Sequence, residues 1–238
     1  GLIAAGLTLT TVLVKSFGAL LLLVFGFVML LLMRRGFVKP IALIAVAIPA
    51  FMAMRILDPG FGTSLPGVFE ALNERASRSL DFRLVNEEML IDKAMRRPIL
   101  GWGGWGRNRV TDEEGTDLAV TDGLWVILLG KYGLVGLVSW SLVFLLPPFL
   151  IARRPRSHPR GRPAPDSACW PIALTLLLQM IDSIPNAMMT PVAIFSAGAL
   201  TSMAAGTLGD LASARPEGST PPEKEHASVH AAPGFDWI

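Results

Sequence analysis

Apolar runs separated by short polar breaks fill the first quarter of this chain. The runs cover residues 1–14, 17–33 and 37–57, with Lys15-Ser16 and Arg34-Arg35 between them. Roughly 17 consecutive apolar residues are the lower limit for a helix that crosses a bilayer. The pattern therefore predicts transmembrane helices here, the first of them truncated. The third run has a short uncharged core, so Lys39 and Arg55 at its ends are expected to extend toward the membrane surface.

Apolar runs return in the second half, after a long polar stretch. One begins at Leu124, is interrupted by Lys131 and continues to Ala152. Residues 168–209 contain a single charge, Asp182, which fits two helices that turn near this residue. We therefore expect an all-α fold, a polytopic transmembrane helical bundle with a large, partly helical extramembrane loop.

The predicted organisation has four parts. Transmembrane helices occupy 1–57, a periplasmic loop 58–121, further transmembrane helices 122–209 with a cytoplasmic basic loop 153–167, and a disordered cytoplasmic tail 210–238. Composition agrees with this class, because 52% of the residues are apolar and mean hydropathy is +0.51. The chain opens on apolar residues without a basic stretch or a cleavage site, so we expect the C-terminal part of a longer polytopic protein.

Charge distribution predicts the orientation. Arg34, Arg35, Lys39 and the basic loop should lie in the cytoplasm. The loop 58–121, the turn at Asp182 and Lys15-Ser16 then share the opposite side, and a long loop can translocate in spite of its own basic residues. The single cysteine, Cys169, excludes an intrachain disulfide and is expected in a helix interface.

Within the loop, one segment reads as an amphipathic helix. Asp81 can cap a helix that starts at Phe82 or Arg83, and Pro98 ends it. Its apolar residues for membrane or partner contact are Leu84, Met89, Ile91 and Met95.

Basic residues of the loop have two interpretations. Arginines such as Arg75, Arg78 and Arg83 suit bidentate binding of a phosphate. They can equally balance the acidic residues of the same loop. The glycines that follow also have two: the amides of Gly101 and Gly103 can approach a ligand, or the segment is an ordinary turn with tryptophan anchors.

Two carboxylates at predicted helix ends complete the set of candidate site residues. Asp122 can accept a proton from an acceptor hydroxyl, or Thr121 or Asp122 can cap the next helix. Asp182 either pairs with a basic residue such as Lys15 or faces water at its turn. The histidines lie in the predicted cytoplasmic segments, and no cluster has metal-ligand spacing.

Several motifs follow one another in a recognisable order. A break, Lys15-Ser16-Phe17-Gly18-Ala19, precedes a span, and Arg83 stands about a helix's length before Pro98-Ile99-Leu100-Gly101-Trp102-Gly103. Thr121-Asp122 then opens a helix that carries Gly133-Leu134-Val135-Gly136-Leu137. Over most of residues 9–205, this order resembles the O-antigen ligase and polysaccharide polymerase superfamily of bacterial membrane glycosyltransferases.

The resemblance implies an enzyme of the inner (cytoplasmic) membrane, multi-pass, that acts in cell-surface polysaccharide biosynthesis. It would transfer a glycan from undecaprenyl pyrophosphate to an acceptor glycan or lipid, without cofactor, metal or nucleic acid. Arg83 would hold the pyrophosphate, with Arg78, Lys15, Gly101 and Gly103 as further substrate-binding residues, and Asp122 would orient or deprotonate the acceptor. Ligase-type members usually place a histidine where this chain has Asp122-Gly123, which argues against lipid A-core ligase activity and leaves a polymerase or another ligase-like transferase.

Two alternatives come from other classes. A polysaccharide transporter or flippase subunit would place polar residues inside several spans. The spans here are nearly free of charge, with Lys131 the main exception. A non-catalytic assembly factor is compatible with the degraded motifs.

Overall fold

The computed structural model describes residues 2–13, 16–35, 37–58, 60–71, 73–153 and 169–213. Lys15, most of the basic loop and most of the predicted C-terminal tail lie outside these residues, and residues 210–213 of that tail are helical. The described part is helical apart from irregular connections and one isolated β-bridge between Thr111 and Asp117. The prediction of an all-α fold is confirmed.

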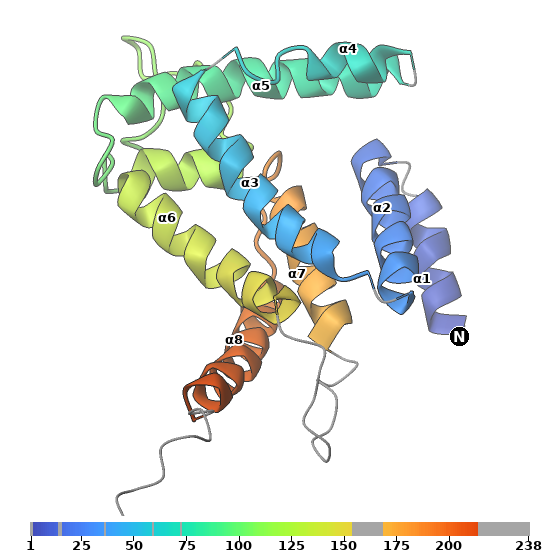
Figure 1. The fold of residues 1–238 in the computed structure, drawn as a ribbon. Coiled ribbons are helices and arrows are strands. Elements are labelled where there is room, and N and C mark those ends of the chain that lie inside the picture. Colours follow the sequence, from blue (N-terminus) through green and yellow to red (C-terminus); the bar gives the residue numbers. More distant parts are fainter. Residues whose placement is uncertain are drawn as a thin grey trace, which may run out of the picture.

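Eight helices make up the described part of the chain (Figure 1). They are α1 (Leu2–Leu13), α2 (Phe17–Arg34), α3 (Lys39–Leu57), α4 (Leu65–Glu70), α5 (Glu74–Met95), α6 (Leu124–Ala152), α7 (Cys169–Asp182) and α8 (Pro191–Ser213). All but α4 and α5 coincide with the apolar runs of the sequence. Among the described residues, only α3 and α6 are both long and apolar enough to cross a membrane. These two helices indicate membrane association, whereas the larger number of spans stays a prediction.

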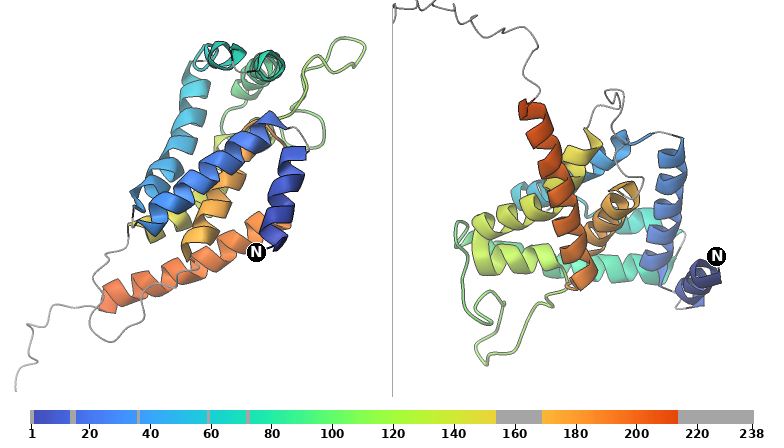
Figure 2. Two further views of the ribbon diagram at one scale, coloured as in Figure 1. Left: turned by 90° about the vertical axis from the view of Figure 1, so that its right-hand side faces the viewer. Right: turned by 90° about the horizontal axis from the view of Figure 1, so that it is seen from below.

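The core forms where α3, α6, α7 and α8 meet. Ile41, Ile48 and Met52 of α3 are buried against the apolar residues of α6 and α7. Helix α2 packs on α7, and α1 contacts α2 at the edge. Helices α4 and α5 lie crosswise over one end of this bundle, and the left view of Figure 2 shows both nearly end-on. The polar loop therefore covers the end at which α3 finishes and α6 begins.

Helix α5 begins earlier than the sequence predicted. Asn73 is its N-cap and accepts a hydrogen bond from the amide of Ala76 at 3.0 Å, so the prediction that Asp81 caps the helix is wrong. The first turns are polar and carry no apolar periodicity, which hid them from a pattern search. The end was predicted well: Met95 is the last helical residue, and Pro98 follows in a turn.

One face of α5 is buried, and its residues recur at helical spacing. Leu84, Glu87, Ile91 and Ala94 point into the protein. Met89 is partly buried against the core, while Met95 is exposed. The burial of Leu84 and Ile91 holds α5 on α6 and fixes which residues α5 presents to the bundle end.

Candidate functional site

Arg83 and Asp122 meet at this end of the bundle. Arg83 lies in the middle of α5, and Asp122 lies just before α6. Arg83 Nε is 3.9 Å from Asp122 Oδ2, and the two side chains are 33% and 39% exposed. The structure therefore brings together the two residues that the sequence selected as catalytic and leaves both open to solvent.

The turn between α7 and α8 supplies the remaining polar groups. Arg83 Nη1 donates to the carbonyl of Pro185 at 2.5 Å and to Asn186 Oδ1 at 3.0 Å. Asn186 Nδ2 in turn donates to Asp182 Oδ1 at 2.9 Å. We call Arg83, Asp122, Asp182 and Asn186 the arginine–carboxylate cluster. Sequence reasoning missed Asn186, although its spacing of four residues from Asp182 in an apolar run was a usable signal.

The start of α6 is capped without a side chain. Gly123 is the N-cap, and the amide of Leu124 donates to the carbonyls of Ser183 and Asn186 at 3.1 and 3.3 Å. A Cβ on Gly123 would lie 2.5 Å from the carbonyl oxygen of Ile184, so the α7–α8 turn needs glycine here. The interpretation of Thr121 or Asp122 as the N-cap is wrong, and the Asp122 carboxylate is left to face Arg83.

A buried anchor lies one helical turn away from the cluster. Glu87 Oε1 accepts from Arg55 Nε at 2.8 Å, and Glu87 Oε2 accepts from Trp125 Nε1 at 3.1 Å. Arg55 is fully buried and also donates to the carbonyls of Phe61 and Leu84. The prediction that Arg55 extends to the membrane surface is therefore wrong, because a carboxylate and two carbonyls satisfy its guanidinium inside the protein.

The buried anchor (Arg55, Glu87 and Trp125) ties α3, α5 and α6 together. Glu87 follows Arg83 by one turn of α5, and Trp125 follows Asp122 by one turn. The Glu87–Trp125 hydrogen bond thus holds α5 and the start of α6 in the register that places Arg83 beside Asp122. Sequence analysis gave Glu87 no part in the candidate site.

Burial raises the pKa of Glu87 above its ordinary value of 4.5, because desolvation outweighs the opposing hydrogen bond and charge of Arg55 and the hydrogen bond of Trp125. The folded protein then holds this proton more tightly than the unfolded chain does. We expect the wild type to gain stability relative to Glu87→Gln as pH falls through the raised pKa, levelling off below 4.5. Denaturant unfolding of both proteins in detergent micelles across this range measures the difference; a difference independent of pH would contradict the expectation.

The turn that contains Gly101 and Gly103, which we call the glycine turn, has a structural role. Gly101 and Gly103 both have positive φ, of 69° and 57°. The amide of Gly103 donates to the carbonyl of Lys131 at 2.9 Å, and that of Gly101 to the carbonyl of Arg97 at 3.0 Å. These amides are engaged within the protein, which is the arrangement expected of the turn interpretation; ligand binding by the two glycines stays an untested prediction.

This turn closes on a break in α6. Gly133 has φ 66° and ψ −165° inside the helix, and Figure 1 shows α6 bent into a short and a long arm. The amide of Trp102 donates to the carbonyl of Gly130, and the amide of Leu134 to that of Pro98, at 2.9 and 2.7 Å. The turn therefore supplies partners for backbone groups that the break leaves free. We call this contact the glycine clasp.

The other predicted site residues lie apart from the cluster or outside the described residues. Arg78 is exposed and pairs with Glu74 along α5 at 3.3 Å. Lys15 is not among the described residues. Its neighbour Ser16 caps α2, and Phe17 stacks edge-on against Phe69 of α4 with ring centroids 6.0 Å apart. The start of α2 thus lies beside α4 of the loop, and the side of a membrane on which both would lie stays a prediction.

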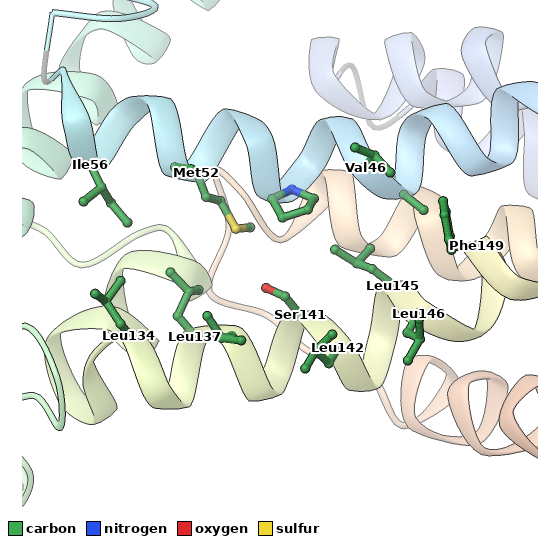
Figure 3. Close-up of a pocket in the computed structure, with 14 residues that line it drawn as sticks. Val46, Met52, Ile56, Leu134, Leu137, Ser141, Leu142, Leu145, Leu146 and Phe149 are labelled. Carbon is green, nitrogen blue, oxygen red and sulfur yellow. The ribbon is translucent and has the colours of Figure 1, made fainter.

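A groove of about 350 Å³ lies between α3 and the long arm of α6 (Figure 3). Met52, Ile56 and Leu137 line it, together with other apolar residues, and Ser141 is its one hydroxyl-bearing side chain. Its walls offer no acid, base or cation for chemistry. The described residues also contain no group of three or more His, Cys, Asp and Glu side chains suited to a metal ion. The arginine–carboxylate cluster brings polar side chains from α5, the start of α6 and the α7–α8 turn into contact and leaves Arg83 and Asp122 partly open to solvent.

No protein-family model, curated protein or solved structure matches this chain. The proposals below therefore rest on its own residues and their geometry.

Proposed function

We propose that this chain belongs to a bacterial membrane glycosyltransferase of the O-antigen ligase and polysaccharide polymerase type. It would transfer or polymerise glycans carried on undecaprenyl pyrophosphate at the periplasmic face of the inner membrane. The observation that carries the proposal is the contact between Arg83 and Asp122. The order of sequence motifs selected these two residues, and they meet at the loop end of both candidate membrane-spanning helices.

Arg83 has the geometry to hold a leaving pyrophosphate. Its Nη1 and Nε atoms face Asn186, Pro185 and Asp122, and its Nη2 makes no hydrogen bond to the described residues. A guanidinium that is one-third exposed can point this edge at a phosphate oxygen. In the proposed reaction the bond between the sugar anomeric carbon and the phosphate oxygen breaks, and Arg83 stabilises the charge that develops on the pyrophosphate.

Asp122 would act on the acceptor. The acceptor hydroxyl oxygen forms the new bond to the anomeric carbon, and its proton passes to the Asp122 carboxylate. The separation of 3.9 Å from Arg83 is longer than a direct charge-assisted hydrogen bond, so the pair can open to admit substrate groups. In this proposal Asp122 takes the place of the histidine usual in ligase-type relatives.

The alternative of a transporter or flippase subunit receives less support. Within the described residues, the buried charge of α3 is Arg55, and it lies at the loop end of the helix, where Glu87 neutralises it. This pair ties helices together and lines no path through the bundle.

Arg83→Ala tests the proposal directly. Loss of one preorganised donor to a developing charge lowers turnover by roughly 100-fold or more, so polymer should nearly disappear while single lipid-linked repeat units accumulate. The measurement is polymer and lipid-linked glycan content in cells that carry the full-length protein with each substitution. Arg109→Ala is the matched control, because it removes an exposed arginine of the same loop that pairs with Asp117 outside the cluster, and it should leave polymer formation unchanged.

Two further outcomes would contradict the proposal. Normal polymer in Arg83→Ala cells with normal protein levels would remove the central role of Arg83. Unchanged polymer amount with altered chain length would indicate a regulator. Arg83→Lys separates catalysis from folding: it keeps a charge but loses the planar fork, so activity should fall while thermal unfolding in micelles stays close to wild type.

A further inference from the structure

Several basic residues near the end of α5 lie close together and form no ion pair with a carboxylate of the described residues. Arg55, Arg78, Arg83 and Arg109 each form an ion pair with a carboxylate. Among the described residues, the cations without a carboxylate at ion-pair distance include Arg75 at the start of α5 and five near its end: Lys93, Arg96, Arg97, Arg107 and Lys131. All five lie on or beside the glycine clasp, so positive charge is concentrated there without internal compensation.

Large apolar side chains project from the same place. Ile99, Leu100 and Trp105 are 67%, 72% and 87% exposed. The Lys131 ammonium lies 5.9 Å from the centre of the Trp105 indole. Exposed aliphatic and aromatic groups surrounded by cations are the composition that proteins present to the interface of an anionic membrane.

The backbone fixes the depth of this surface. The amides of Leu134 and Val135 begin the long, apolar arm of α6 and donate to the carbonyls of Pro98 and Ile99 at 2.7 and 3.2 Å. If the long arm crosses the bilayer, Ile99 and Leu100 lie where it leaves the hydrocarbon. The surface therefore sits at the level of the lipid headgroups.

The surface is also held rigidly. The Trp102 indole lies between the charged groups of Lys93 and Arg97, which are 4.4 and 4.5 Å from its centre. Its Nε1 donates to the carbonyl of Lys93 at 2.8 Å. Two of the cations are thus positioned before any ligand arrives, which lowers the entropy lost on binding.

We propose that residues 93–107 and Lys131 form a docking surface for anionic phospholipids. Ile99, Leu100 and Trp105 enter the upper acyl region, and the unpaired cations bind the headgroup phosphates. Charge complementarity and the exposed side chains of Ile99, Leu100 and Trp105, which we call the apolar tip, together favour a lipid over a free phosphate. A free phosphate would make no favourable contact with the apolar tip. This surface is separate from the arginine–carboxylate cluster, and its role does not depend on the proposed reaction.

Quenching of tryptophan fluorescence by brominated lipids tests the proposal. The protein is reconstituted in nanodiscs of phosphatidylcholine that contain an equal fraction of brominated phosphatidylglycerol or brominated phosphatidylcholine. The Trp105 signal is the difference between wild type and Trp105→Phe. We expect stronger quenching of this signal by the anionic lipid, and Arg96→Gln/Arg97→Gln should reduce the preference by on the order of ten-fold. High salt should weaken it as well.

Arg75→Gln/Arg78→Gln is the matched control, because it removes two exposed arginines from the other end of α5. It should keep the wild-type preference. Equal quenching by the two lipids in the wild type, or an equal loss of preference in the two double variants, would overturn the proposal. A Trp105 signal that neither brominated lipid quenches would place the tip outside the membrane and overturn it too. Added inorganic phosphate that abolishes the preference at constant ionic strength would assign the cations to a free anion.

Discussion

Arg55→Ala is expected to destabilise the protein by about 3–5 kcal/mol, as is usual when one partner of a buried ion pair is removed. The substitution leaves Glu87 buried beside Trp125 without its cation and deprives the carbonyls of Phe61 and Leu84 of a donor. It also removes the volume of a large, fully buried side chain. Denaturant unfolding in detergent micelles, followed by circular dichroism, measures the loss.

Arg78→Ala is the control for the loss of stability, since its ion pair with Glu74 is exposed and such pairs contribute about 1 kcal/mol or less. The double variant Arg55→Met/Glu87→Met should be less destabilised than the sum of its single variants, because it leaves no unpaired buried charge. An Arg55→Ala protein as stable as Arg78→Ala would show that the buried anchor does not hold α3, α5 and α6 together.

Gly133→Ala is expected to cost about 3 kcal/mol or more and to open the glycine clasp. Its φ and ψ lie in a region that glycine alone adopts readily, and a Cβ there would collide with the carbonyl of Ile99 and lie 2.6 Å from the amide nitrogen of Gly101. An alanine would favour a continuous helix through residue 133. The backbone groups of α6 that now bond to the glycine turn would then bond within the helix instead. Thermal unfolding gives the stability, and tryptic cleavage after Arg96 and Arg107 reports release of the turn.

Gly198→Ala provides the comparison. Gly198 lies in α8, and a Cβ there meets no atom within 4 Å, so alanine should be neutral or should stabilise the helix by about 1 kcal/mol. If Gly133→Ala matched Gly198→Ala in both stability and tryptic resistance, the break in α6 would not depend on glycine.

Much of the candidate site was accessible from the sequence, and the reasons differ from residue to residue. Arg83 was one of several arginines in a charged loop and Asp122 one of two candidates for a helix cap, so only the order of motifs selected these two. Asn186 was missed because an uncharged amide in a turn is a weaker signal than a charge, although its spacing of four residues from Asp182 was usable. Arg55 was misjudged, since a cation at the end of an apolar run has two solutions: it can reach water, or it can find a buried carboxylate. Only the position of Glu87 decides between them.

The sequence alone could not decide between the two interpretations of Gly101 and Gly103. A Gly-Trp-Gly sequence has amides that can approach a ligand or another backbone. Hydrogen bonds from Gly103 to Lys131 and from Trp102 to Gly130 show that these amides contact another backbone in the folded chain, and ligand binding by Gly101 and Gly103 stays a prediction.

The sequence by itself determined the helices that follow apolar runs, because such runs, glycine and proline act locally on the chain, but it missed α4 and the first turns of α5. It determined the side of the bundle to which the loop and the Asp182 turn belong, since an alternating path of helices leaves little choice. Tertiary structure alone decided which polar groups meet: Glu87 with Arg55, Arg83 with Asp122 and Asn186, and the glycine turn with the break in α6. The physical reason is that a polar group's partner depends on helix register and on the cost of leaving the group unpaired, and neither is a local property of the chain.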